Sequence, residues 1–274
     1  MPFAAFLLAD LLLALAGGGQ HALHRDPSSP DAPPYSCWLH VPAEAAADPD
    51  ARFPLLLFLH GSGERGDSLE DPSALDRVCY NGPPLHLQRG DWQPPAPMIV
   101  LSPQSHTEDW EPQDVRALLE WADARLPVDR SRIYLTGLSR GGYGVWNYLA
   151  VYGGGAGDPL AIAAAAPICG GPTRPVPQPD VRGGTPLWAF HGEVDDIVPP
   201  SMSVDAVLAV AALDPVEAPR LTILPGVNHG SWVPVYAGND LGSGMAHWPE
   251  NPAVDSMLVP YSPDLYTWLL AHRR

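Results

Sequence analysis

Two kinds of hydrophobic run alternate along the chain. Short apolar runs are typical of strands, and longer runs with apolar residues three and four positions apart are typical of helices. Residues 55–59, Leu-Leu-Leu-Phe-Leu, form a continuous apolar run, as expected of a strand buried on both faces. The pattern predicts strands over residues 35–41, 55–59, 98–101, 133–136, 161–166, 187–190 and 221–224, and helices over residues 113–126, 141–152, 201–213 and 263–272.

This alternation of strands and helices predicts an α/β fold with a mostly parallel central sheet and helices on both faces. A length of 274 residues suffices for one such domain, which we assign to residues 35–274, preceded by an N-terminal segment over residues 1–34. Residues 236–262 fit no element and are interpreted as an insertion. Long irregular loops in compact domains are usually functional or mobile.

The N-terminus has two interpretations. Residues 3–16 are apolar and end in Ala14-Leu15-Ala16, which has the small-x-small form of a signal-peptide cleavage site. No Lys or Arg precedes this run, however, and Asp10 interrupts it. A signal peptide over residues 1–16 predicts a secreted or periplasmic protein, whereas a helix packed on the domain predicts a cytoplasmic one. The run is too short to span a bilayer.

The charge balance argues against two classes of partner. The formal net charge is −16, and all 15 basic residues are Arg. Such an acidic surface repels nucleic acids and anionic membranes. The three cysteines, Cys37, Cys79 and Cys169, have neither metal-binding spacing nor the even number of a disulfide framework, so we expect buried thiols. No metal or organic cofactor is implied, and the oligomeric state is left open.

The strongest chemical motif is Gly137-Leu138-Ser139-Arg140-Gly141, between a predicted strand and a predicted helix. This strand–turn–helix setting is that of a nucleophile elbow, in which a strained turn exposes the serine. A serine hydroxyl is a weak nucleophile and needs a base. His229 follows the last predicted strand, where the order nucleophile, acid, base places it.

An acidic residue must orient this histidine. Three acidic residues, Glu193, Asp195 and Asp196, follow the predicted strand at 187–190, and local sequence does not choose among them.

Catalysis by an activated serine also needs donors for a developing oxyanion. One is the N–H of Arg140, the residue after the nucleophile. The second is expected from the loop at residues 60–66, His-Gly-Ser-Gly-Glu-Arg-Gly, with Ser62 favoured over Gly63. This loop lacks the Gly-Lys-Ser/Thr ending of a P-loop and the Gly-x-Gly-x-x-Gly spacing of a dinucleotide site.

These segments together resemble the α/β-hydrolase esterases of the phospholipase/carboxylesterase family, which includes predicted peptidases and relatives of polyhydroxybutyrate depolymerases and feruloyl esterases. The resemblance runs from about Tyr35 to the C-terminus. Its motifs are residues 57–66, Ser102-Pro103-Gln104 with Trp110, residues 132–144, residues 166–171, Trp188-Ala189-Phe190-His191-Gly192 with Asp195 and Val198-Pro199, and His229 with Ser231-Trp232.

The resemblance implies which residues carry the chemistry. In the pattern His-Gly-x-x-Asp-x-x-Val-Pro the acid is Asp195, the base is His229, and the second oxyanion donor is Ser62. Gly63, Gln104 and Trp232 are candidate substrate-binding residues.

The sequence departs from the family at two places. Val233 stands where the family often has Asp, and the insertion at residues 236–262 follows soon after His229, so we expect it to cover or narrow the cleft. Trp232, Trp248 and Trp110 are candidates for an aromatic wall, with core packing the favoured role of Trp110.

The implied activity is that of a serine carboxylic-ester hydrolase that forms an acyl-enzyme on a small-molecule or polymeric ester. A serine peptidase of the same fold and a non-catalytic binding protein on a hydrolase scaffold are the alternatives.

Overall fold

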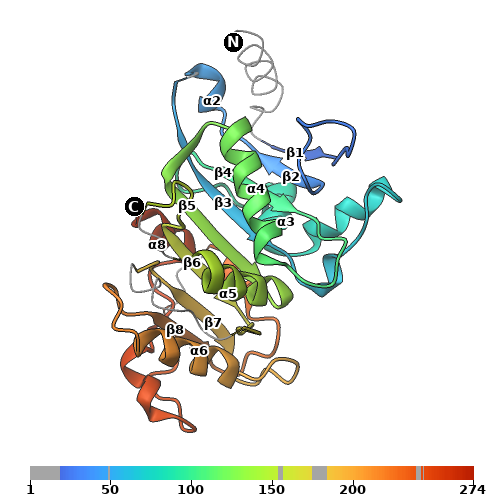
Figure 1. Cartoon of the computed structure of the whole chain (residues 1–274). Helices are drawn as coiled ribbons and strands as arrows, with labels where there is room; N and C mark the ends of the chain where they lie inside the picture. Colours follow the sequence, from blue (N-terminus) through green and yellow to red (C-terminus); the bar gives the residue numbers. More distant parts are fainter. Residues whose placement is uncertain (1–18, 49, 154–156, 175–183, 239–241, 243) are drawn as a thin grey trace.

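The computed structural model describes residues 19–48, 50–153, 157–174, 184–238, 242 and 244–274 (Figure 1). The two interpretations of residues 3–16 lie outside these residues. Eight strands form one sheet in the order β1-β2-β4-β3-β5-β6-β7-β8. Their bounds are β1 Gln20–Leu23, β2 Cys37–His40, β3 Phe53–Leu59, β4 Ile99–Pro103, β5 Val128–Leu138, β6 Ala164–Ile168, β7 Trp188–Gly192 and β8 Arg220–Leu224.

The sheet is parallel from β4 through β8, and the strand β2 runs antiparallel to both β1 and β4. All seven residues of β3 are buried, because helices cover both faces of the sheet. Leu55, Leu57 and Leu59 pack in one hydrophobic cluster, while Leu56 and Phe58 pack in the other. The continuous apolar run is therefore explained by a central strand with two buried faces.

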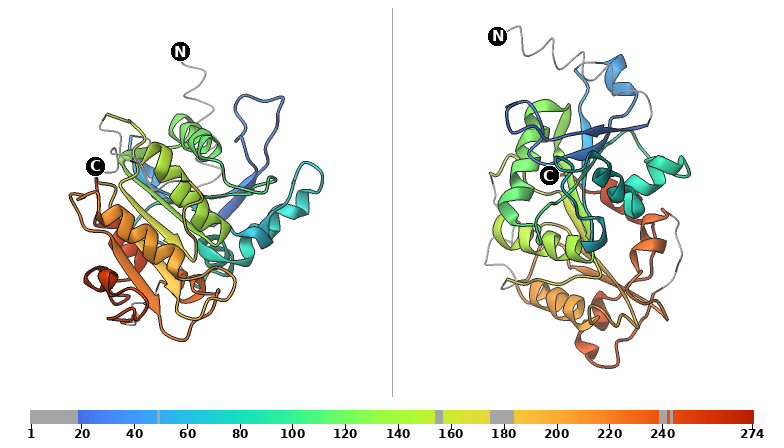
Figure 2. Two further views of the ribbon diagram at one scale, coloured as in Figure 1. Left: turned by 60° about the horizontal axis from the view of Figure 1, so that its bottom comes forward. Right: turned by 90° about the vertical axis from the view of Figure 1, so that its right-hand side faces the viewer.

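The helices divide between the two faces. Those on the face of Leu55 are α4, α5 and α6, which lie in front of the sheet in Figure 1, and those on the face of Leu56 are α3, α7 and α8 (Figure 2). The helical bounds are α2 Glu44–Ala47, η1 Ser62–Glu64, η2 Pro72–Tyr80, α3 Gly82–Arg89, α4 Pro112–Arg125, α5 Arg140–Tyr152, α6 Ser201–Ala211, α7 Trp232–Tyr236, η4 Pro252–Met257 and α8 Leu265–Leu270, with η marking 3₁₀ helices. In the described part of the chain, no helix combines the length and the hydrophobicity needed to cross a membrane.

The structure adds elements that the hydrophobic pattern did not predict. β1 extends the sheet beyond β2, and α3 begins with Gly-Pro-Pro, which lacks the amphipathic start of a typical helix. The strand β5 begins at Val128, five residues before the predicted start, because it continues through the polar residues 129–132.

The segment at residues 236–262 packs along the outer edge of β8. The N–H groups of Met245 and Val259 donate to the carbonyls of Ile223 and Leu221, each over 2.9 Å. Trp248 is 4% exposed and lies in the same hydrophobic cluster as α6. The described residues of this segment therefore extend the core at the sheet edge.

Candidate active site

Ser139 occupies a strained turn between β5 and α5. Its backbone has φ 51° and ψ −116°, which is unusual for a residue with a side chain. The flanking glycines allow this turn to pack tightly: a Cβ on Gly141 would lie 1.9 Å from the carbonyl oxygen of Leu59, and one on Gly137 would lie 2.5 Å from that of Gly141. The structure thus has the geometry of a nucleophile elbow.

A continuous hydrogen-bond chain joins Ser139, His229 and Asp195. The Oγ of Ser139 lies 2.9 Å from Nε2 of His229, and Nδ1 of His229 lies 2.7 Å from Oδ2 of Asp195. A carboxylate accepts hydrogen bonds, so Nδ1 carries the hydrogen and Nε2 accepts from the serine hydroxyl. The chain can therefore move a proton from the serine to the imidazole.

Asp195 is buried and fully hydrogen-bonded. Its Oδ1 accepts the N–H groups of Ile197 and Val198 over 3.0 and 2.9 Å. Burial alone would raise the pKa of Asp195, but hydrogen bonds from His191, Val198 and His229 outweigh it and hold the pKa well below its usual range. The carboxylate therefore stays charged beside the imidazole.

The two rival carboxylates have other surroundings. Asp196 is exposed, and Glu193 accepts the N–H of Gly226 over 2.7 Å. The structure thus brings Asp195, and neither of the rivals, into hydrogen-bond contact with His229.

His191 is a residue of this site for which sequence reasoning assigned no role. It is completely buried, and its Nε2 lies 2.9 Å from the carbonyl oxygen of Val198 and 3.2 Å from Oδ2 of Asp195. Both neighbours are acceptors, so Nε2 carries a hydrogen that supports the carboxylate. The motif His-Gly-x-x-Asp contained this residue, but only the fold shows that the loop turns the carboxylate back towards it.

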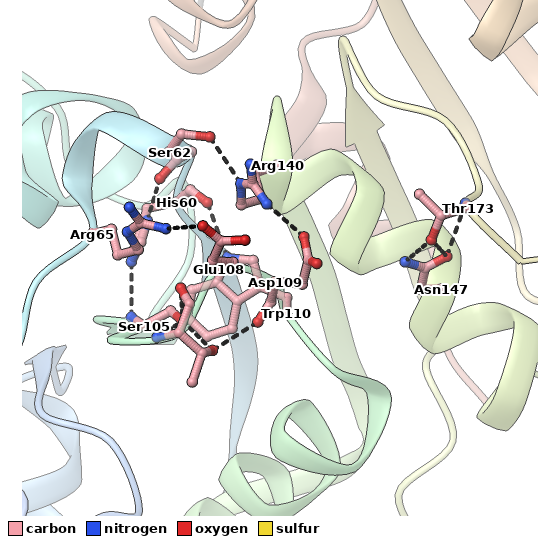
Figure 3. A network of polar contacts seen from close by, with 12 residues as sticks. His60, Ser62, Arg65, Ser105, Glu108, Asp109, Trp110, Arg140, Asn147 and Thr173 are labelled. Carbon is pink, nitrogen blue, oxygen red and sulfur yellow. Dashed lines mark hydrogen bonds and ion pairs between the residues drawn. The ribbon is translucent and has the colours of Figure 1, made fainter.

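The two predicted oxyanion donors each begin a helix, and their side chains are in contact. Ser62 is the first residue of η1 and Arg140 the first residue of α5, positions whose N–H groups have no partner within the helix. The Nε of Arg140 also donates to Oγ of Ser62 over 2.9 Å, and its Nη1 lies 2.5 Å from Oδ1 of Asp109 (Figure 3). Gly63 is exposed, and a Cβ added to it would meet no atom within 4 Å.

His60 holds the loop that carries Ser62. Its Nδ1 lies 2.6 Å from the carbonyl oxygen of Gly61, and its Nε2 accepts the N–H of Ser105 over 2.9 Å. The indole of Trp110 donates to the His60 carbonyl over 3.0 Å (Figure 3). Trp110 is only 2% exposed, so its expected role in core packing is confirmed.

Two proposed substrate-contacting residues lie elsewhere. Gln104 is 2% exposed, and its Nε2 donates to the carbonyls of Glu64 and Ala74. It therefore braces the loop at residues 60–66, which we call the oxyanion loop because it carries the predicted donor Ser62. Trp248 is buried in the same hydrophobic cluster as α6, and the expected aromatic wall does not form. Trp232 is the member of that set that lies at the site, with its ring 5.2 Å from that of His229.

Cys169 lies directly beside the backbone of Ser139. Its Sγ accepts the N–H of Ser139 over 3.3 Å, and burial raises its pKa to about 12, so it is a thiol. Ligand-type atoms of Cys169, Asp195 and His229 lie within 4.8 Å of one another, an arrangement that could hold a metal ion. The hydrogen bonds of Asp195 and His229 account for their closeness without one.

A cleft of about 410 Å³ opens over Ser139. Its lining combines polar and apolar side chains, and no described residue of the segment at 236–262 is among them. The lining residues are Ser62, Asp109, Ser139, Arg140, Tyr143, Thr173, Ile197 and Val198. The volume lies within the usual range of small-molecule binding sites.

The sheet order, the elbow and the position of the cleft define an α/β-hydrolase fold. No family model and no curated protein matches the sequence. Among solved structures, a thermostable esterase is similar at 26% identity and a TM-score of 0.59, over 95% of this chain and 64% of that protein. The chain therefore spans less than two thirds of the length of that esterase.

Two further solved structures share the fold at lower identity. MGS-M1, an α/β-hydrolase from a deep-sea metagenome library of the Medee basin, has 16% identity and a TM-score of 0.51 over 78% of this chain and 84% of its own. Dipeptidyl peptidase 4 of Porphyromonas gingivalis has 15% identity and a TM-score of 0.51 over 80% of this chain and 33% of its own. The predicted α/β-hydrolase fold is confirmed.

Proposed function

We propose that the chain is a serine carboxylic-ester hydrolase with Ser139 as nucleophile, His229 as general base and Asp195 as the orienting acid. The observation that carries this proposal is the hydrogen-bond chain from Ser139 through His229 to Asp195, at 2.9 and 2.7 Å. The strained backbone of Ser139 and the adjoining cleft support it.

The reaction has two halves. His229 takes the hydroxyl proton of Ser139 as the oxygen attacks the ester carbonyl, and Asp195 stabilises the imidazolium that forms. The N–H groups of Ser62 and Arg140 stabilise the negative oxygen of the tetrahedral intermediate. The intermediate collapses, His229 gives its proton to the departing alcohol, and an acyl-enzyme remains. Water activated by His229 then releases the acid and restores Ser139.

The first alternative is a serine peptidase that uses the same residues. An ester releases its alcohol more readily than an amide releases its amine, so comparison of p-nitrophenyl acetate with a peptidyl p-nitroanilide separates the two. We expect turnover of the ester with little or none of the anilide. Turnover of the anilide without the ester would overturn the proposal.

The second alternative is a binding protein on an inactive hydrolase scaffold. A fluorophosphonate probe distinguishes it, because the probe reacts only with an activated serine. We expect stoichiometric labelling of the wild type and none of Ser139→Ala, with both proteins showing the same thermal unfolding. A correctly folded wild type that stays unlabelled would favour the scaffold.

The proposed substrate is a small-molecule or polymeric ester, with no nucleic-acid partner. The net charge of −16 argues against anionic polymers. An ester panel with graded acyl length and aryl character would define the class, and we expect a preference for acyl groups that fit the cleft of about 410 Å³.

A further inference from the structure

Glu64 is a buried carboxylate beside the nucleophile for which the proposed reaction has no use. It ends η1, two residues after the oxyanion donor Ser62, and is 4% exposed. Burial raises the pKa of Glu64, and hydrogen bonds from Asn81 and from the N–H groups of Glu64 and Gly61 lower it again in part. A buried acidic group is costly to keep unless its oxygens are hydrogen-bonded, so its partners indicate its purpose.

Asn81 is the partner whose side chain connects Glu64 to a second element. It stands at the N-cap of α3, where Asn normally accepts an N–H of the second or third helical residue. Those residues are Pro83 and Pro84, which have no N–H, and the Asn81 side chain makes no capping bond. Its Nδ2 donates to Glu64, and its Oδ1 accepts the indole N–H of Trp232 over 2.9 Å.

These partners fix the orientation of the Asn81 amide. An indole N–H can only donate, so Oδ1 must face Trp232 and Nδ2 must face the carboxylate oxygen of Glu64. The amide thus bridges two groups that lie on separate segments, η1 and the start of α7.

Trp232 completes the connection to the base. Its ring stands perpendicular to that of His229, at 90°, with the centroids 5.2 Å apart. An edge-to-face contact of this kind restricts rotation of the imidazole. The indole is itself held in place by its hydrogen bond to Asn81.

We infer that Glu64, Asn81 and Trp232 are positioning residues that tie the oxyanion loop to the His229 ring, so that donor and base keep a fixed relation to Ser139. The inference rests on the proposed function. None of the three is among the described residues that line the cleft over Ser139, so their loss should lower kcat and leave KM nearly unchanged.

Trp232→Phe tests the link to the base, with Trp38→Phe as its matched control. Each variant keeps an aromatic ring and removes one indole hydrogen bond from a part-buried tryptophan, since Trp38 donates to the Leu75 carbonyl over 3.1 Å. We expect similar falls in melting temperature, but a roughly tenfold loss of kcat in Trp232→Phe alone. An unchanged kcat in Trp232→Phe, or an equal loss in Trp38→Phe, would overturn the inference.

Glu64→Gln tests the other end, with Glu108→Gln as the control. An amide in place of the carboxylate cannot accept from Asn81 and from two backbone N–H groups together, whereas Glu108 is 85% exposed beside Arg65. We expect lower kcat in Glu64→Gln only, and the double variant Glu64→Gln/Trp232→Phe should lose no more than the worse single variant. If the two single-variant losses of kcat, expressed as free energies, add fully in the double variant, Glu64 and Trp232 act independently and the proposed connection is wrong.

The NMR signal of the Trp232 indole N–H reports on the connection between Glu64 and Trp232 whether or not the protein is an esterase. The indole N–H resonance of Trp232, assigned by its absence in Trp232→Phe, should shift in Glu64→Gln and stay in place in Glu108→Gln. A wild type without esterase activity or probe labelling would refute the proposed function, and the resonance would still report on the connection. An unmoved resonance in Glu64→Gln would refute the connection itself.

Discussion

The Nε2 atom of His60 accepts the backbone N–H of Ser105, and this bond decides where the ring carries its hydrogen. Because Nε2 is an acceptor, the hydrogen lies on Nδ1 and is donated to the carbonyl of Gly61 over 2.6 Å. That carbonyl and the N–H of Ser62 belong to one planar trans peptide, in which they point in opposite directions. The neutral imidazole therefore sets the direction of the proposed oxyanion donor.

Loss of the hydrogen bond between His60 and the Gly61 carbonyl should lower kcat more than it changes KM. We expect His60→Ala to lower kcat by roughly 10- to 100-fold with a small change in KM. An oxyanion donor stabilises charge that develops only in the transition state, so a misdirected donor raises the barrier and has little effect on substrate binding. Steady-state kinetics on p-nitrophenyl acetate measure this. His86→Ala, at a histidine paired with Asp91 away from the cleft, should keep wild-type kinetics.

His60 should also make the protein less stable in mild acid. Burial lowers the pKa of His60 to about 4 from its ordinary 6.5. Between these values the unfolded chain binds a proton that the native ring does not, so the free energy of unfolding falls as the pH falls from about 6.5 to about 4, by at most roughly 3 kcal/mol. Urea unfolding at several pH values should show a flatter decline in His60→Ala. An identical decline in both proteins would contradict this assignment.

Asp195 and Asp196 should behave very differently when each is changed to asparagine. Asp195→Asn removes the acceptor that holds Nδ1–H of His229, and the loss of kcat should reach roughly 10⁴-fold, as for the equivalent change in serine proteases. Asp196→Asn changes an exposed neighbour and should leave kcat within twofold. Both variants can be compared by fluorophosphonate labelling rate. A large effect at Asp196 would reverse the assignment.

The glycines of the elbow should tolerate no side chain. Gly141→Ala would place a Cβ 1.9 Å from the Leu59 carbonyl oxygen, a contact that requires backbone movement. We expect a loss of several kcal/mol of unfolding free energy, or failure to fold. Gly63→Ala meets open space and should unfold within a few degrees of the wild type. Thermal denaturation followed by circular dichroism distinguishes the two.

Asp109 should weaken the binding of negatively charged esters in the cleft. It pairs with the Arg140 guanidinium, and the side chains are 63% and 35% exposed, so the pair contributes little to stability. Asp109→Ala leaves the cation unpaired in the cleft. We expect KM to fall a few-fold for an ester with a carboxylate in its acyl group and to change little for a neutral ester of the same size. Added salt should reduce the difference, and equal changes for both esters would speak against this role.

The sequence predicted the elements that the hydrophobic pattern marks strongly, and with them the chain positions of Ser139 and His229. It could not separate Asp195 from its neighbour Asp196 by local rules. In a tight loop, the side chain that turns inward is the one that finds a hydrogen-bond partner there. The partner of Asp195 is His229, which lies 34 residues later in the sequence.

The two wrong predictions of this site, substrate contact by Gln104 and by Trp248, have a common physical cause. Gln104 and Trp248 have side chains suited to binding a substrate. Such side chains can equally well form hydrogen bonds with buried backbone groups or fill space in the hydrophobic core. Gln104 braces the oxyanion loop, and Trp248 is buried in the hydrophobic cluster that includes residues of α6. Whether a polar or aromatic side chain faces a cleft depends on how neighbouring segments pack, which hydrophobic periodicity does not encode.

The thiol of Cys169, beside the proposed nucleophile Ser139, bears on how the protein should respond to oxidants and alkylating agents. All three cysteines are buried and free, and Cys169 keeps its proton at neutral pH because its pKa is about 12. Alkylating agents and peroxides attack the exposed thiolate form. Iodoacetamide and hydrogen peroxide should therefore leave the three cysteines of the folded protein unmodified, even though the sulfur atom of Cys169 lies 3.3 Å from the backbone nitrogen of Ser139.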